Sequence, residues 1–196
     1  VRAIDVATGR TRWQTDTRLE LSAGPGAGEG LVVVGTNGGQ LVALDAASEP
    51  YPLPGLHICD VVAQRAKAEG RKRIALLGTK YTMEGPAYRA AFARHGLEMR
   101  APGAADREML SRIIFDELCL GRFEEPARRA FVRVIETLKG EGCDAVALSC
   151  TEIPILITPD VSPLPALDST RLLAHAAVAV ATGKAPMPAW RGGPLG

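Results

Sequence analysis

Two short polar segments carry the side chains of this sequence that are best suited to chemistry. Residues 149–152 read Ser-Cys-Thr-Glu and follow an apolar run, while Thr79 and Thr82 follow a second apolar run. If both runs are strands of a parallel sheet, the segments lie outside the carboxyl ends of those strands, where open α/β sheets bind ligands. Hydroxyls and backbone N–H groups at such a place can hold a carboxylate. The thiol of Cys150 can act there as an acid or a base, once nearby donors adjust its pKa.

The composition argues against several classes of function. The chain has 196 residues, a formal net charge of +1 and 46% hydrophobic residues, and its basic side chains are scattered. This balance disfavours nucleic acid or an anionic membrane as the main partner. No run approaches the roughly eighteen apolar residues of a membrane span, and no signal peptide follows Val1, so we expect no membrane span.

The cysteines indicate reduced thiols rather than a disulfide framework or a metal site. The chain has four of them, none in a C-x-x-C pair and none at a zinc-ligand spacing from a histidine. We therefore expect a cytoplasmic protein with no bound metal. A cysteine is by default a small buried side chain, so we expect Cys119 and Cys143 to lie in the core. Cys59 is expected to be either packed or exposed.

Residues 51–182 alternate between strand and helix patterns. Apolar runs at 73–78, 145–148 and 165–167 predict buried strands. Amphipathic patterns predict the helices, with Asp168 or Ser169 as the N-cap of the last one. These helices are expected at residues 60–68, 86–95, 106–118, 125–139 and 169–182. The alternation is typical of an α/β fold, a parallel sheet flanked by helices on both faces.

Residues 1–48 instead have the pattern of antiparallel β-hairpins. Runs at 31–35 and 40–44 flank a tight Asn-Gly-Gly turn at 37–39. The phrase A-x-D-x-x-x-G-x-x-x-W occurs at 3–13, and a second copy begins at Ala43 but breaks off. These features resemble one blade of a quinoprotein-like β-propeller, of the kind found in the propeller lipoproteins of outer-membrane protein assembly. Since roughly four to eight blades close a propeller, a single blade would be a fragment.

A set of sequence blocks in the second part of the chain carries a more specific resemblance. In order they are LHICD, IALLGTKYTME, IIFDELCLG, ALSCTEIPILI and PALDSTRLLAHAAVA. Their order and spacing, from about residue 53 to residue 181, resemble the second half of the aspartate/glutamate racemases. The resemblance implies a pyridoxal-independent racemase built from two similar α/β domains, each giving one cysteine to a site between them. One thiolate removes the Cα proton, and the other thiol delivers a proton to the opposite face.

The same resemblance implies roles for individual residues. Cys150 matches the second cysteine of the family, in a G-C-T-E signature whose glycine is replaced by serine here. Thr151 would bind substrate, and Glu152 would orient the thiol or the substrate ammonium group. Thr79 and Thr82, from a G-T-x-[YF]-T-M signature, would line the same pocket. The family implies a small-molecule amino acid as substrate, no cofactor and a homodimer, without indicating which amino acid is bound.

The predicted organisation is a blade-like fragment at 1–48, a junction at 49–54, an α/β domain at 55–182 and a disordered tail at 183–196. The C-N-T cysteine block of the racemases' first domain is not found in the sequence, so the resemblance implies an impaired racemase. Two alternatives stay open. The chain could be a non-enzymatic β-propeller-type module of envelope assembly, or an artificial fusion of two gene fragments that meet near residues 48–50.

Overall fold

The computed structural model describes residues 2–4, 8, 10–14, 26–28, 31–35, 41–45 and 55–188. The chain divides into two compact units, each of which is described by itself. Residues 59–176 make up the continuous part of the larger unit, while residues 1–58 and 177–194 make up the smaller one. All the predicted site residues lie in the larger unit.

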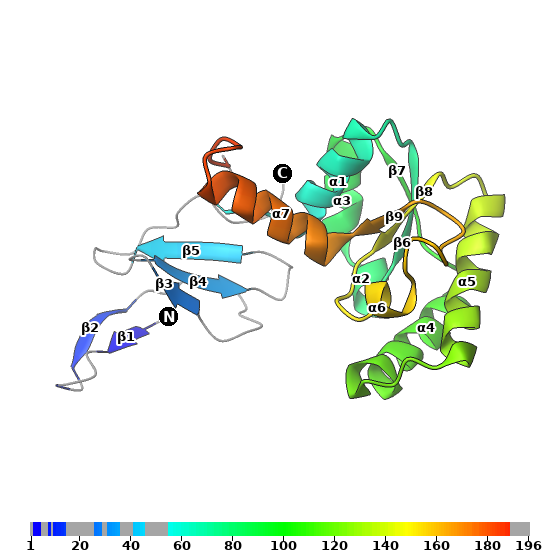
Figure 1. Cartoon of the computed structure of the whole chain (residues 1–196), viewed down its shortest axis with the longest axis horizontal. Helices are drawn as coiled ribbons and strands as arrows, with labels where there is room; N and C mark the ends of the chain where they lie inside the picture. Colours follow the sequence, from blue (N-terminus) through cyan, green and yellow to red (C-terminus); the bar gives the residue numbers. More distant parts are fainter. Residues whose placement is uncertain are drawn as a thin grey trace. The chain divides into compact units, whose positions relative to one another are not determined.

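A parallel sheet forms the centre of the larger unit. It consists of β6 (Arg73–Leu77), β7 (Glu98–Arg100), β8 (Ala145–Leu148) and β9 (Ala166–Asp168), in the spatial order β7-β6-β8-β9. β6 is buried from Ile74 onward and β8 is buried along its whole length, as expected for strands covered on both faces. Figure 1 shows α1 and α3 on one side of these strands and α5 on the other. The predicted α/β class is confirmed for this unit.

Helices connect the strands and cover the sheet. In chain order they are α1 (Ile58–Ala68), α2 (Lys80–Glu84), α3 (Pro86–Arg94), α4 (Ala104–Asp116), the 3-10 turn η1 (Leu118–Leu120), α5 (Glu125–Gly140), α6 (Ile153–Leu156) and α7 (Ser169–Ala181). Side chains of α4 and α5 form one hydrophobic cluster with alternate residues of β6 and β8, since successive strand residues point to opposite faces. Full burial of a large member such as Phe131 contributes about 1.5–3 kcal/mol.

The predicted boundaries in this unit agree with the structure to within two residues. The sequence pattern does not predict α2, α6 or β7, because segments of three to five residues are too short to show a period. It also does not predict the break after α4. There Glu117 leaves the helical conformation, and η1 is capped by Gly121, whose left-handed backbone (φ 75°) favours glycine.

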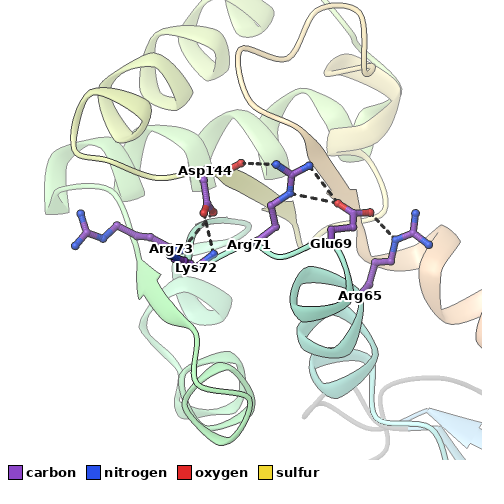
Figure 2. Close-up of polar contacts among 6 residues, drawn as sticks. All are labelled: Arg65, Glu69, Arg71, Lys72, Arg73 and Asp144. Atoms are coloured by element: carbon purple, nitrogen blue, oxygen red, sulfur yellow. Dashed lines mark hydrogen bonds and ion pairs between the residues drawn. The ribbon is translucent and has the colours of Figure 1, made fainter.

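Asp144, just before β8, joins the amino ends of the two central strands (Figure 2). Its carboxylate accepts the backbone N–H groups of Lys72, at 2.8 Å, and Arg73, at 3.2 Å. The guanidinium of Arg71 donates to the Asp144 carbonyl at 3.4 Å and also contacts the carboxylate of Glu69. Both backbone donors precede or begin β6, so this network fixes the start of β6 beside the start of β8.

The smaller unit contains antiparallel strands. β4 (Leu31–Gly35) pairs with β5 (Leu41–Asp45) and with β3 (Gly26–Gly28), while β1 (Arg2–Ile4) pairs with β2 (Thr11–Gln14). These strands agree with the hairpin prediction. The predicted turn at 37–39 and the junction at 49–54 lie outside the described residues, and a propeller blade stays a prediction. Of the predicted tail, residues 183–188 are described and contain neither helix nor strand.

Candidate active site

The structure brings the two predicted polar segments together at the carboxyl edge of the sheet. β6 and β8 pair in register from Ile74↔Ala145 to Leu77↔Leu148, so the residues that follow each strand emerge side by side. The Ser149 N–H continues the pairing by donating to the Leu77 carbonyl at 2.8 Å. Gly78 lies so close that a Cβ placed on it would be 3.1 Å from both the Ser149 carbonyl oxygen and the Thr82 Cβ.

Thr79 and Thr82 lie on one side of this edge, at the start of α2. Thr79 is the N-cap of that helix, and its hydroxyl accepts the Thr82 N–H at 3.4 Å. The two hydroxyl oxygens are 3.2 Å apart, so one donates to the other. The next residue, Lys80, donates its N–H to the Ser111 hydroxyl on α4 at 3.2 Å, which anchors the segment. The hydroxyls are half-buried and fixed in place.

Cys150 and Glu152 form a donor–acceptor pair on the other side of the edge. The half-buried Cys150 packs against the hydrophobic cluster, and its Sγ–H donates to Glu152 Oε2 at 2.9 Å. Burial, and next the hydrogen bond to Glu152, raise the pKa of the Cys150 thiol to about 12. Burial alone would raise the pKa of Glu152, but hydrogen bonds from Cys150, Thr151 and its own backbone lower it. Near neutral pH the sulfur is therefore a thiol and its partner a carboxylate.

The exposure of Cys119 differs from the sequence prediction. We expected it in the core, but it is exposed, because η1 interrupts the helix and Leu118 takes the buried position instead. Partial burial of the thiol, followed by the negative charge of Glu152, raises the pKa of Cys119. Cys119 therefore lies within electrostatic reach of the site. Its closeness to Glu152 has no signal in the sequence, because it depends on a 3-10 turn.

The other two cysteines are core residues. Cys143 is 5% exposed, as predicted, and burial raises its pKa to about 11. Cys59 is 2% exposed, which settles the open choice between packing and exposure.

A hollow of about 970 Å³ borders β8 and β9, and neither Cys150 nor Glu152 lines it. Thr151 is exposed and lines it, together with residues of the α6 segment and the first half of α7. Asp168 also lines the hollow, and its carboxylate accepts the Arg171 N–H at 3.0 Å, so Asp168 caps α7. The polar and charged residues of the lining are Arg65, Thr151, Thr158, Asp160, Asp168, Thr170, Arg171 and His175.

No cluster of three or more His, Cys, Asp and Glu side chains in the described part of the chain is arranged to hold a metal ion. No helix in the same residues has both the length and the apolar character that crossing a bilayer requires.

Comparisons with known proteins give a consistent result for most of the chain. A family model described as Asp/Glu/Hydantoin racemase matches residues 12–177. A crystal structure from Yersinia pestis, assigned as an Asp/Glu racemase, is 40% identical with a TM-score of 0.62, covering 70% of this chain and 58% of that one. The glutamate racemase of Corynebacterium kroppenstedtii is 28% identical over 130 residues, which is 66% of this chain and 44% of that protein.

A shorter similarity involves another kind of protein. The outer membrane protein assembly factor BamB of Xanthomonas campestris is 42% identical over 57 residues, 24% of this chain and 14% of that protein. The chain thus spans about half the length of the racemases it matches and a small part of the assembly factor.

Proposed function

Because the chain belongs to the Asp/Glu/hydantoin racemase family, we propose that it moves the Cα proton of an acidic amino acid without a cofactor, using Cys150 as acid and base. The observation that carries the proposal is the Cys150–Glu152 pair, 2.9 Å apart at the carboxyl end of a central strand. Thr79 and Thr82, at the end of the neighbouring strand, are proposed to bind the substrate together with Thr151.

The protonation states of the pair suggest how the proton moves. A thiol whose pKa is raised to about 12 holds a proton that it can donate to a carbanion on its own face. In the reverse direction the sulfur must first lose this proton, and the hydrogen-bonded Glu152 carboxylate is the neighbouring acceptor; because the pKa of Glu152 is lowered, this transfer is uphill and forms the thiolate only transiently. The thiolate then takes the proton from Cα, so that one proton rests on Glu152 and one on sulfur. Glu152 is therefore proposed to control whether Cys150 is a thiolate, the form that can act as a base.

One sulfur serves one face of the α-carbon. Removal and return of the proton on that face exchanges hydrogen without changing configuration, whereas inversion needs a second acid on the opposite face. We therefore propose that this chain by itself exchanges the Cα proton faster than it inverts the carbon. A cytoplasmic location and a homodimer are further parts of the proposal.

The direct test is proton exchange in deuterated water. We expect the chain to incorporate deuterium at Cα of aspartate or glutamate, measured by loss of the Cα proton signal in NMR spectra, while optical rotation changes more slowly. Cys150→Ser should remove the exchange. Cys143→Ala is the matched control, since it removes a buried thiol at the amino end of β8 and should retain exchange. No exchange by the unmodified chain, or undiminished exchange by Cys150→Ser, would contradict the proposal.

A second candidate rests on the 42% identity of a 57-residue stretch to the assembly factor BamB. Under it, residues 1–48 act as a propeller-like module and the α/β part is a passenger, joined naturally or by an artificial fusion of gene fragments. Fusion of two unrelated fragments predicts that the units unfold separately. A single cooperative thermal transition of the purified chain would count against it.

A further inference from the structure

Ser169, the first residue of α7, has a buried hydroxyl that the helix does not use as its cap. Among the residues of α7, all of which the structure describes, Ser169 alone is buried, with 2% of its surface exposed. The sequence left Asp168 and Ser169 as alternative N-caps, and the structure gives that role to Asp168, whose carboxylate accepts the Arg171 N–H at 3.0 Å. A buried hydroxyl that is not the cap needs another partner.

The partner of the Ser169 hydroxyl is the main chain just before Cys150. The hydroxyl donates to the carbonyl of Leu148, the last residue of β8, at 2.9 Å. The N–H of the same peptide unit, which belongs to Ser149, donates to the Leu77 carbonyl at 2.8 Å. The C=O and N–H of a trans peptide point in opposite directions, so this peptide plane is held from both sides. It cannot rotate without losing one of the two hydrogen bonds.

The orientation of this peptide plane matters because Cys150 follows it directly. Residues 150–152 belong to neither a strand nor a helix, so no regular hydrogen-bond pattern holds the thiol in place. Its position depends on the peptide before it and on α6 after it. Proton transfer at carbon needs the reacting atoms in close and aligned contact, and a misplacement of about 1 Å can cost a hundredfold in rate.

Tyr88 of α3 supports the Ser169 hydroxyl from inside the core. Tyr88 is 5% exposed, and its ring packs edge-to-face on Phe92 with the centroids 5.7 Å apart. Burial, and next the nearby charge of Cys59, raise the pKa of Tyr88, so its hydroxyl keeps its proton. Interactions with the Ser149 and Ser169 hydroxyls act in the opposite direction, because both lie next to it. The Ser149 contact is a loose one, since its buried hydroxyl makes no hydrogen bond of standard geometry with any described residue.

We propose that Ser169 is a positioning residue for Cys150, which fixes the peptide plane before the thiol by holding the Leu148 carbonyl, with Tyr88 supporting the Ser169 hydroxyl. This role rests on the proposed function of Cys150 as acid and base. It adds to the site one residue from α7 and one from α3 that do not touch the substrate. A serine that only satisfied a buried carbonyl would contribute to stability without affecting Cys150 in particular.

Alkylation by iodoacetamide tests the positioning without substrate or turnover. Burial is the first cause of the raised pKa of Cys150, so a thiol that is held less tightly should react faster. We expect Ser169→Ala to increase the alkylation rate of Cys150 at pH 8 by about threefold to tenfold, measured by mass spectrometry of the cysteine peptides. Cys143, at the amino end of the same strand, should keep its rate, which separates a local change from general loosening.

Proton exchange should change in the opposite direction. In Ser169→Ala we expect the rate of Cα exchange at saturating substrate to fall by about tenfold. The substrate concentration that gives half of the maximal rate should stay within about twofold, because Ser169 does not touch the substrate. A purely structural role would leave the rate per folded molecule unchanged.

Ser162→Ala is the matched control. The Ser162 hydroxyl donates to the Leu164 carbonyl at 2.6 Å, so this variant loses the same kind of hydrogen bond from a half-buried serine before β9. Loss of one such bond should lower the Tm of either variant by about 2–4 °C. Ser162→Ala should leave the alkylation of Cys150 and the exchange rate unchanged.

Tyr88→Phe is a second variant, which also serves if Ser169→Ala does not fold. It keeps the ring and removes only the hydroxyl, so we expect the same directions with effects of about twofold to threefold. The double variant should change the alkylation rate of Cys150 by less than the product of the two single effects, because both act through one peptide.

An unchanged alkylation rate of Cys150 in Ser169→Ala, or an equal increase at Cys143, would overturn the inference. If Ser169→Ala does not fold, an unchanged rate in Tyr88→Phe would do the same. Failure of the unmodified chain to exchange the Cα proton would instead reject the proposed function, while the alkylation rates still decide whether Ser169 positions the thiol.

Discussion

The two ends of the central strands use a carboxylate in opposite ways. At the amino end, Asp144 accepts the backbone N–H groups of Lys72 and Arg73, whose donors are fixed in the main chain. At the carboxyl end, Glu152 accepts a hydrogen bond from the Cys150 thiol, whose proton is movable. The difference teaches that the donor, rather than the carboxylate, decides whether such a contact serves stability or chemistry.

Replacing Glu152, at the carboxyl end of the strands, should have the largest effect of the changes considered, and the effect should be on proton exchange. Glu152→Gln removes the proton acceptor of the thiol, so we expect deuterium exchange at Cα to fall by about a hundredfold or more. Thermal stability should change by less than about 1 kcal/mol, because the residue lies at the rim of the site. Glu136→Gln, an exposed change on α5, should alter neither quantity. An unchanged exchange rate in Glu152→Gln would remove the carboxylate from the mechanism.

Replacing Asp144 should have the opposite pattern. Asp144→Ala leaves two backbone donors without their charged acceptor, so we expect the free energy of unfolding to fall by about 2–3 kcal/mol. The exchange rate per folded molecule should stay constant. Chemical denaturation measures the first and NMR the second, with Asp116→Ala at the exposed end of α4 as the control. A loss of exchange without a loss of stability would contradict the division between the two ends.

The pH dependence of thiol reactivity tests whether the pKa of Cys150, at the carboxyl end of β8, is raised. Since the Cys150 pKa is raised to about 12, the sulfur is mostly protonated at pH 8 and should react slowly with iodoacetamide, with a rate that still increases above pH 9. The exposed Cys119 should react first. Mass spectrometry of each cysteine peptide measures these rates, and a Cys150 rate independent of pH above 8 would contradict the shift.

The smallest expected effect is at Gly78, where the strand ends meet. Gly78→Ala puts a methyl group 3.1 Å from the Ser149 carbonyl and the Thr82 Cβ, so these neighbours must move by a few tenths of an ångström. We expect a loss of about 1 kcal/mol in stability and a severalfold loss of exchange. Gly103→Ala, where no atom lies within 4 Å of the added Cβ, is the matched control.

The sequence predicts the strands and long helices well, because their apolar patterns extend over enough residues to define a period. It also predicts that residues after β6 and β8 meet, since parallel strands share an edge. It does not predict the environment of Cys119. The helical sequence pattern continues through Glu117, but the backbone leaves the helical conformation at that residue. The hollow is not predicted either, since Arg171 and Thr151 belong to segments that approach only in the folded chain.

The fixed pairing of Asp144 with the residues before β6 has a consequence for how this region can change in length. From that anchor the chain is extended through Leu148, advancing about 3.3 Å per residue and alternating sides. The number of residues in β8 therefore fixes how far Cys150 lies from Asp144. An insertion in the loops after α5 or α6 leaves Cys150 where it is, whereas one residue added to the strand would carry the sulfur past its partners and turn it toward the opposite layer of helices.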